Sequence, residues 1–175
     1  MDETGFLLIP NVRRTWAPRG QTPILRHRVK RDKVSAISAV TVSGQRQRLG
    51  LYLHFHNANI THVEVALFLR ELLTHLRGQL IVIWDGGSIH KGPDVRALLK
   101  RHPRVHVCQF PGYAPELNPD EFVWSYYKRE LSNGRPMDID ELLGDLVRIS
   151  RKVRKRSRLL RSFVVASDLP PFLRP

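Results

Sequence analysis

Two acidic residues stand where a carboxylate could take part in chemistry, and the first of them is Asp85. It follows directly after the apolar run Leu80 to Trp84, which is typical of a strand buried on both faces. In open α/β sheets the functional crevice lies at the carboxyl ends of the strands, so an acid followed by Gly86 and Gly87 is well placed. An Asp-Gly pair is also an ordinary turn signal, and for Asp85 taken alone the turn is the favoured interpretation.

The second acid, Glu121, lies in the first turn of a predicted helix. Asn118 is a favoured N-cap and Pro119 suits the first helical position, so the helix is expected to begin there. Glu121 also stands where a capping box places its carboxylate, which offers a purely structural alternative. The apolar residues that follow form a stripe along the helix and leave Glu121 on its flank, from where it could face the end of the sheet.

The sequence around these two acids follows a distinctive pattern. The apolar strand, its acid and a His-containing turn read IVIWDGGSIH, and the next aliphatic strand reads VHVCQF. A proline-rich segment, PGYAPELNP, then leads to Glu121 and the aromatic helix FVWSYYK. This pattern closely resembles the catalytic core of DDE transposases of the mariner superfamily, above all the bacterial insertion sequence family six-thirty. The resemblance extends from Asp2 to about Leu131, and the long proline-rich segment makes it specific.

The resemblance implies a third acid near the first residue of the chain. Such transposases have an opening strand with Asp-Glu-(Ser/Thr)-x-Phe, and this chain begins MDETGF, so Asp2 would be the first catalytic acid. Asp85 and Glu121 would complete the triad. The following VRRTWAPRG resembles the family's Arg-x-Trp-x-Pro-(Arg/Lys)-Gly segment.

Three carboxylates at the end of an apolar sheet repel one another and are stable as anions only when cations share the site. Hard divalent cations take oxygen ligands, so Asp2, Asp85 and Glu121 are expected to hold two Mg²⁺ or Mn²⁺ ions. Two such ions would activate the attacking oxygen and stabilise the leaving oxygen during displacement at phosphorus. The resemblance implies attack by water when the end of an insertion element is cut, and by a DNA 3′-hydroxyl when that end is joined to target DNA.

Two departures from the family pattern concern these acids. Many relatives have Asn directly after the second catalytic Asp, where this chain has Gly86. Asp120 precedes Glu121 where relatives often have an apolar residue, so the ligand is ambiguous by one position. Glu121 is preferred because it takes the place of the motif's acid after Asn-Pro-x.

The function expected from the resemblance is metal-dependent DNA strand cleavage and strand transfer by a catalytic domain that spans residues 1–175. Relatives carry an upstream helix-turn-helix region that recognises terminal repeats, and nothing before Asp2 could form one, so a truncated or split-frame transposase is expected. Its active assembly would be a homodimer on DNA. Two alternatives are a non-catalytic DNA-binding remnant and a related ribonuclease-H-like nuclease.

Composition limits the number of domains, the kind of partner and the cellular location that we expect. A chain of 175 residues with 42% hydrophobic content suits one domain with a proper core. The net charge of +13 favours polyanions, either nucleic acid or an anionic membrane face. Without a membrane span or a signal peptide, the protein is expected to be soluble and to act on DNA in the bacterial cytoplasm. Cys108 lies in an apolar run and is expected to be a small core residue.

Two basic segments are candidates for DNA contacts. In the loop after the first strand, basic residues alternate with an aromatic one, which suits a DNA backbone and an unstacked base. The residues concerned are Arg13, Arg14, Trp16 and Arg19. The alternative is a solvated loop that its tryptophan anchors to the core. A basic helical segment at 151–161 supplies Lys152, Arg154, Lys155 and Arg156, although such runs are often merely solvated.

The elements that must position the acids follow from periodicity and cap signals. Strands are expected at 2–9, 33–42, 48–55, 80–84 and 105–110, and helices after Thr61, at 93–101, from 119 and, with an interruption, over 138–166. This order matches an α/β, ribonuclease-H-like fold with a central five-stranded mixed sheet and helices on both faces. In that fold the first and fourth strands are neighbours, which would bring Asp2 beside Asp85. A metal site at His54 and His56 is conceivable, but ordinary hairpin histidines are favoured.

Overall fold

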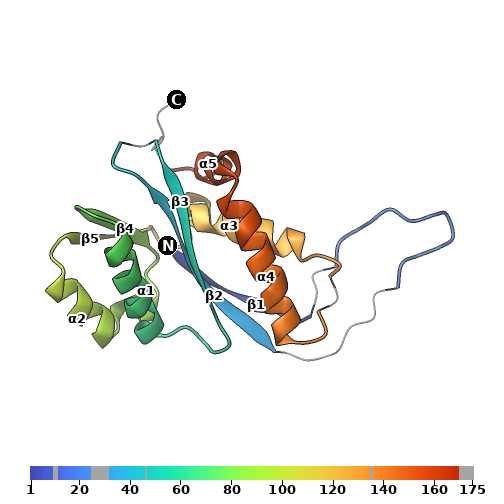
Figure 1. The fold of residues 1–175 in the computed structure, drawn as a ribbon, viewed down its shortest axis with the longest axis horizontal. Coiled ribbons are helices and arrows are strands. Elements are labelled where there is room, and N and C mark those ends of the chain that lie inside the picture. The colour runs from blue at the N-terminus through green and yellow to red at the C-terminus, as the bar shows by residue number, and fades with distance from the viewer. Residues whose placement is uncertain (10–11, 25–31, 46, 135, 170–175) are drawn as a thin grey trace.

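The computed structural model describes residues 1–9, 12–24, 32–45, 47–134 and 136–169, which form five strands and five α-helices (Figure 1). The strands are β1 (Asp2–Leu7), β2 (Lys33–Val42), β3 (Leu49–His56), β4 (Leu80–Trp84) and β5 (Val105–Gln109). The helices are α1 (His62–His75), α2 (Pro93–Arg101), α3 (Pro119–Glu130), α4 (Ile139–Arg154) and α5 (Ser157–Ala166). Two short 3₁₀ helices, η1 (Ser88–Lys91) and η2 (Pro115–Leu117), precede α2 and α3. The predicted elements are therefore confirmed, with small shifts at their ends.

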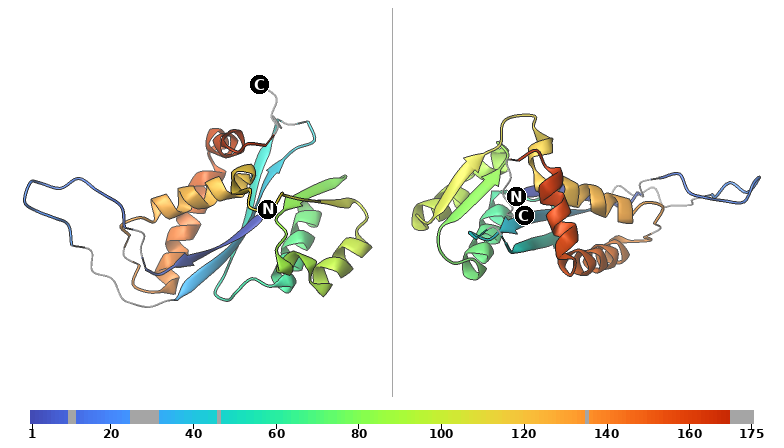
Figure 2. Two further views of the ribbon diagram at one scale, coloured as in Figure 1. Left: turned by 180° about the vertical axis from the view of Figure 1, so that it is seen from behind. Right: turned by 90° about the horizontal axis from the view of Figure 1, so that it is seen from above.

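Strand β2 is the middle strand of an antiparallel sheet with the order β1-β2-β3. Its side chains alternate between two hydrophobic cores, as the pleat of a strand requires. Val34 and Ala36 belong to the core beneath α3, α4 and α5, whereas Ile37 and Ala39 belong to the core shared with α1, β4, α2 and β5. Figure 2 shows these two groups of elements on opposite faces of the sheet. The expectation of helices on both faces is confirmed.

The expected five-stranded sheet is wrong for the residues that the structure describes. β4 and β5 pair in parallel as a sheet of their own, separate from the β1-β2-β3 sheet. Strand β1 meets β4 at one hydrogen bond, from the Met1 amino group to the Ile83 carbonyl at 3.0 Å. Met1 precedes β1 and Ile83 is the last residue but one of β4, so the start of β1 lies beside the end of β4, and the described residues of the two strands form no ladder with one another.

Only one face of the β4-β5 pair is covered. Val82, Trp84 and Val105 face the core with α1 and α2, but Ile81 on the other face is 65% exposed. Cys108 is exposed as well, opposite Ile83 in the ladder. The expectations of a strand buried on both faces and of a core cysteine are therefore wrong. None of the described helices is long and apolar enough to cross a membrane.

Candidate active site

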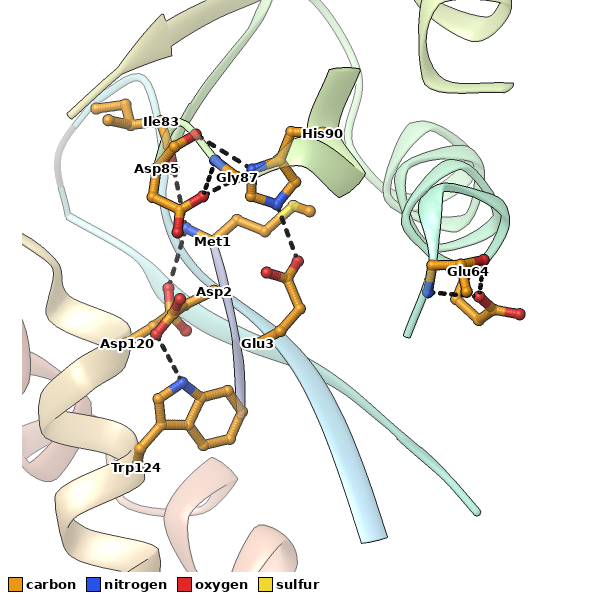
Figure 3. A network of polar contacts seen from close by, with 11 residues as sticks. Met1, Asp2, Glu3, Glu64, Ile83, Asp85, Gly87, His90, Asp120 and Trp124 are labelled. Atoms are coloured by element: carbon orange, nitrogen blue, oxygen red, sulfur yellow. Dashed lines mark hydrogen bonds and ion pairs between the residues drawn. The ribbon is translucent and has the colours of Figure 1, made fainter. Parts of the chain in front are cut away.

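Asp2 lies between the antiparallel sheet and helix α3. It is the first residue of β1, and its partner across the ladder is Ser38 of β2. The Trp124 indole Nε1 donates to Asp2 Oδ2 at 2.9 Å, so a side chain of α3 fixes this carboxylate (Figure 3). The Trp124 ring is itself buried and meets Phe6 edge to face. The position of Asp2 is thus determined by the packing of α3 on β1.

Asp120 turns inward and is 1% exposed. Its carboxylate accepts hydrogen bonds from the Ser38 hydroxyl and, at 3.3 Å, from the Val40 backbone N–H. The Met1 ammonium group lies 3.1 Å from the same carboxylate. Val40 lies beyond the residues of β2 that pair with β1. The Asp120 carboxylate therefore accepts from a backbone N–H of β2 that has no partner in β1. Asp120 therefore fastens the first turn of α3 to β2.

Glu121, the next residue, is half-buried on the flank of α3. The N-cap is Asn118, as predicted, and its side chain accepts from the Asp120 N–H. In a capping box, Glu121 would bind the Asn118 N–H, but that N–H donates to the Pro115 carbonyl at 3.0 Å. The capping-box alternative for Glu121 is therefore wrong.

The crowding of acids at this end of the sheet has an electrostatic consequence. Burial, followed by the negative charges of Asp120, Glu121 and Glu3, raises the pKa of Asp2 to about 7, although the Met1 ammonium opposes the change. Glu121 is thus close enough to Asp2 for the two charges to repel one another. A cation placed among these carboxylates would relieve that repulsion.

Asp85 follows β4 as predicted, but its surroundings differ from those of Asp2. The side chain is 59% exposed. Its Oδ1 accepts from the Gly87 N–H at 2.8 Å and lies 2.9 Å from His90 Nδ1. The first contact is an Asx-type turn, so the turn interpretation of Asp85 describes its local structure correctly. It does not exclude a ligand role, because the other carboxylate oxygen remains.

His90 connects this turn to the first strand. The ring is buried and stacks on Trp84, with centroids 4.5 Å apart and planes inclined by 5°. Its Nε2 lies 3.2 Å from Glu3 Oε1, and its Nδ1 lies 3.2 Å from the Asp85 carbonyl oxygen. Burial lowers the pKa of His90, but the hydrogen bond and charge of Glu3, together with Asp85, outweigh it, so the pKa lies above its usual value.

The structure brings the three predicted acids to one end of the two sheets without closing a ligand set. The Met1 amino group contacts both the Ile83 carbonyl, two residues before Asp85, and Asp120 (Figure 3). Within the described ranges, however, no three His, Cys, Asp or Glu side chains are grouped to hold one metal ion. The histidines of β3 form no such group either, and His54 pairs with Glu71 at 2.6 Å.

Four contact residues of this region were missed by sequence reasoning: Glu3, Ser38, His90 and Trp124. Two of them had a signal. Glu3 lies beside Asp2 in the opening motif, and alternation along a strand places its side chain on the opposite face. His90 is the histidine of the turn in IVIWDGGSIH. The contacts of Ser38 and Trp124 arise from packing and had no local signal.

The loop over residues 12–24 protrudes from the body of the molecule (Figure 1). Its base is held at Arg13, whose backbone N–H donates to Asn133 Oδ1 at 2.9 Å and whose carbonyl accepts from Asn133 Nδ2 at 3.1 Å. Trp16 is 100% exposed, so the alternative in which it anchors the loop to the core is wrong. Arg14 and Arg19 are exposed too.

The basic segment at 151–161 spans the break between α4 and α5. Lys152 forms an ion pair with Glu130. Arg154 donates to the carbonyls of Leu51 and Leu53 at 3.1 and 3.4 Å, covering the open edge of β3. Lys155 and Arg156 lie in the break itself and are exposed. Of the four predicted cations, Lys152 and Arg154 thus have partners within the fold, whereas Lys155 and Arg156 face solvent.

Chains from structures of the Mos1 mariner transposase have a similar fold. The Mos1 paired-end complex with Mg matches with a TM-score of 0.64 at 15% identity, over 95% of this chain and 52% of that chain. The paired-end complex with Mn matches with a TM-score of 0.62 at 16% identity, over 97% of this chain and 55% of that chain. The catalytic domain of Mos1 matches with a TM-score of 0.52 at 14% identity, over 81% of this chain and 78% of that chain.

This chain therefore spans about half the length of the Mos1 chains in the paired-end complexes. At such identities the likeness concerns the fold alone, and it confirms the expected α/β, ribonuclease-H-like type. No curated protein sequence matches the chain. The family of DDE superfamily endonucleases matches residues 1–143, which is most of the sequence. The chain belongs to the DDE superfamily of endonucleases.

Proposed function

We propose that this chain is the catalytic domain of a transposase that cleaves DNA strands at insertion-element ends and joins them to target DNA with the aid of Mg²⁺ or Mn²⁺. One observation carries the proposal. The chain belongs to the DDE family, and the carboxylates of Asp2 and Glu121 lie close enough to repel one another. Asp85 directly follows β4, whose end lies beside the start of β1. Anionic crowding of this kind at a sheet end is typical of a cation site.

The donor set suits a hard divalent cation. The three acids offer only oxygen atoms; burial first, and then repulsion by neighbouring acids, raises the pKa of Asp2 to about 7, and a bound cation would relieve the repulsive part. Asp2, Asp85 and Glu121 would hold the metal, and Asp120 would hold α3 in place. When bound, such ions activate an attacking oxygen and stabilise a leaving oxygen at phosphorus. Mos1 structures contain Mn and Mg.

The chain's own residues support the site from two sides. Trp124 donates to Asp2 and keeps its carboxylate on the α3 face of the sheet. Gly87 and His90 contact Oδ1 of Asp85, and the side chain as a whole is 59% exposed. Movement of the exposed Asp85 turn toward Asp2 would complete a ligand set that the described residues do not form on their own.

DNA is the proposed substrate and partner. The net charge of +13 provides the long-range attraction, and exposed cations provide contacts with phosphates. The proposed contacts are Arg13, Arg14, Trp16 and Arg19 in the loop, and Lys152, Arg154, Lys155 and Arg156 near the break between α4 and α5, with Lys155 and Arg156 the most accessible of the second group. Mos1 forms paired-end complexes, one of them with the left transposon end. For this chain we propose a homodimer on DNA as the active assembly, acting in the bacterial cytoplasm.

A second candidate is DNA binding without catalysis. It is favoured by the absence, within the described ranges, of three side chains grouped to hold one metal ion. The two functions share the same basic surface, so affinity for DNA does not distinguish them. Only metal-dependent chemistry does.

The distinguishing experiment is nicking of supercoiled plasmid DNA in Mn²⁺. The variants are Asp85→Asn and Glu121→Gln, with Asp94→Asn as the matched control, since Asp94 is an exposed acid of α2 paired with His62 at 2.7 Å. We expect nicking by wild type and the control and none by the two site variants. Plasmid binding without nicking by wild type would establish the second candidate, and nicking that survives both site substitutions would refute the proposed site.

A further inference from the structure

His90 links the two segments that carry the first two candidate acids. Glu3, on one side of it, is the neighbour of Asp2 in β1, and Asp85, on the other side, follows β4. The ring contacts both carboxylates, through Nε2 to Glu3 at 3.2 Å and through Nδ1 to Asp85 at 2.9 Å (Figure 3). Among the described residues, the hydrogen bond at Met1 joins the start of β1 to β4, so this side-chain bridge adds a polar connection between the two sheets.

The ring itself has little freedom to turn. Its side chain is 2% exposed and lies flat on Trp84, which is also buried. Both ring nitrogens have partners, so a rotation would break two contacts in a place where water cannot replace them. The imidazole can therefore transmit the position of Glu3 to Asp85.

The Asp85 turn has few other restraints. Asp85 is followed by Gly86 and Gly87, and glycine pairs allow many backbone conformations. The side chain is 59% exposed, and the contacts described for its carboxylate are the Gly87 N–H and His90. The Gly87 contact lies within the same turn and moves with it. His90 is thus the contact that ties the carboxylate to a different part of the fold.

We propose that His90 is a positioning residue that sets the orientation of the Asp85 carboxylate relative to Asp2 by holding it to Glu3. The side chains of Asp2 and Glu3 lie on opposite faces of β1. The start of this strand therefore carries Asp2 directly and, through Glu3 and His90, also holds Asp85. The inference rests on the proposed metal site. Contacts of this kind around metal ligands typically contribute about 10- to 100-fold in metal affinity.

Three variants and a matched control test it. His90→Phe keeps an aromatic ring on Trp84 and removes both polar contacts. Glu3→Ala removes the distant anchor without touching the turn, and Glu3→Gln keeps an oxygen that can accept from Nε2. The control is His54→Phe, because His54 forms a similar pair with Glu71 and also packs against an aromatic ring, that of Phe68.

The first measurement needs no metal. Gly87 donates its N–H to Asp85 Oδ1, so hydrogen exchange of the Gly87 amide, followed by NMR, reports how firmly the turn is held. We expect exchange to accelerate by about tenfold or more in His90→Phe and Glu3→Ala, and to stay near the wild-type rate in Glu3→Gln and His54→Phe. Unchanged exchange in both His90→Phe and Glu3→Ala would overturn the proposal. If His90→Phe does not fold, Glu3→Ala decides the question alone.

The second measurement is Mn²⁺ affinity by electron paramagnetic resonance of the unbound ion. We expect His90→Phe and Glu3→Ala to bind Mn²⁺ about 10- to 100-fold more weakly, Glu3→Gln to recover most of the loss, and plasmid affinity to stay unchanged in all of them. Equal Mn²⁺ affinity in wild type and the two weakened variants would contradict the role of His90. A wild type that binds no Mn²⁺ at all would instead contradict the proposed function, and Gly87 exchange would still decide whether His90 holds the turn.

Discussion

The two halves of the candidate site are held by different means. On the β1-α3 side, Asp2 and Asp120 lie between α3 and the sheet, and their hydrogen bonds come from the buried side chains of Trp124 and Ser38. On the β4 side, Asp85 is 59% exposed, and its carboxylate contacts a backbone N–H of its own turn and the His90 ring. The first half owes its geometry to packing, and the second half to one hydrogen bond and one ion pair.

The difference also concerns charge. Packing buries Asp2 and brings it close to other acids, and the burial first and then the repulsion raise its pKa to about 7. The Asp85 turn, by contrast, can move because it is exposed and contains two glycines. We infer that the Asp2 half attracts a cation and that the Asp85 half adjusts to it. Four predictions test this division, beginning with the largest expected effect.

Glu121 and Asp120 are adjacent, but we propose different roles for them: Glu121 binds the metal, and Asp120 holds α3 in place. Glu121→Gln should lower Mn²⁺-dependent plasmid nicking by about a thousandfold, because several kcal/mol of charge stabilisation by the metal site are lost, while the stability of the protein changes little. Asp120→Asn should lower nicking by only about 10- to 100-fold, through displacement of α3. Nicking rates and urea unfolding of both variants check this. A larger loss of nicking in Asp120→Asn than in Glu121→Gln would exchange the two roles.

The contacts of Asp120 on the β1-α3 side should stabilise the folded protein. Asp120→Ala removes the partner of the Ser38 hydroxyl, the Val40 N–H and the Met1 ammonium, and we expect a loss of about 3 kcal/mol in the free energy of unfolding. Urea denaturation measures it. Asp145→Ala is the control, since the pair of Asp145 with Arg148 is mostly exposed and should contribute at most about 1 kcal/mol. Equal losses in the two variants would mean that Asp120 does not fasten α3.

The pH dependence of stability should reveal the burial and repulsion that act on Asp2. Because the folded-state pKa of about 7 lies above the ordinary value of 3.8, the folded state binds more protons between these two values, and stability falls as pH rises through this window. Asp2→Asn keeps an oxygen for Trp124 and does not titrate. In EDTA, the variant should match wild type near pH 4 and exceed it by about 2 kcal/mol at pH 8. A wild type that is the more stable protein at pH 8 would contradict the repulsion, and saturating Mn²⁺ should reduce the gap.

The smallest effect is expected from the basic surface. Replacing Lys155 and Arg156 with Gln should reduce the slope of log affinity for duplex DNA against log salt by up to about 2, or roughly 0.9 for each phosphate contact. Arg154→Gln should act mainly on stability, because its guanidinium binds the backbone of β3. Fluorescence anisotropy at several salt concentrations measures the slopes. An unchanged slope in the double variant would leave the protruding loop at 12–24 as the proposed DNA surface.

The sequence was sufficient for what local signals determine. The capping box at Thr61, the N-cap at Asn118 and the alternation in β2 and β3 each predict the element that is observed. It also placed Asp2 at the end of β1 near the end of β4, through the family resemblance. These features depend on residues close together in the chain, or on a motif whose spacing is specific.

What could not be predicted depends on tertiary placement. Nothing local indicates whether Asp120 or Glu121 turns toward the sheet, since both positions are polar and only the packing of α3 on β2 decides. Periodicity likewise does not reveal that the face of Ile81 and Cys108 stays uncovered, because an apolar run fits a strand with one covered face as well as two. The division of the described strands into two sheets is not visible in local periodicity either.

We infer that Asp2 and Asp85, held in such different ways, bind the same cation. Isothermal titration of Mn²⁺ into wild type, Asp2→Asn, Asp85→Asn and the double variant tests this, with His54→Phe as the control. We expect Mn²⁺ binding by wild type and the control, a large loss of affinity in each single variant, and a double variant that binds little more weakly than either single one, because the two acids act on one site. Wild-type affinity retained in either single variant, or losses that simply add in the double variant, would contradict a shared metal site.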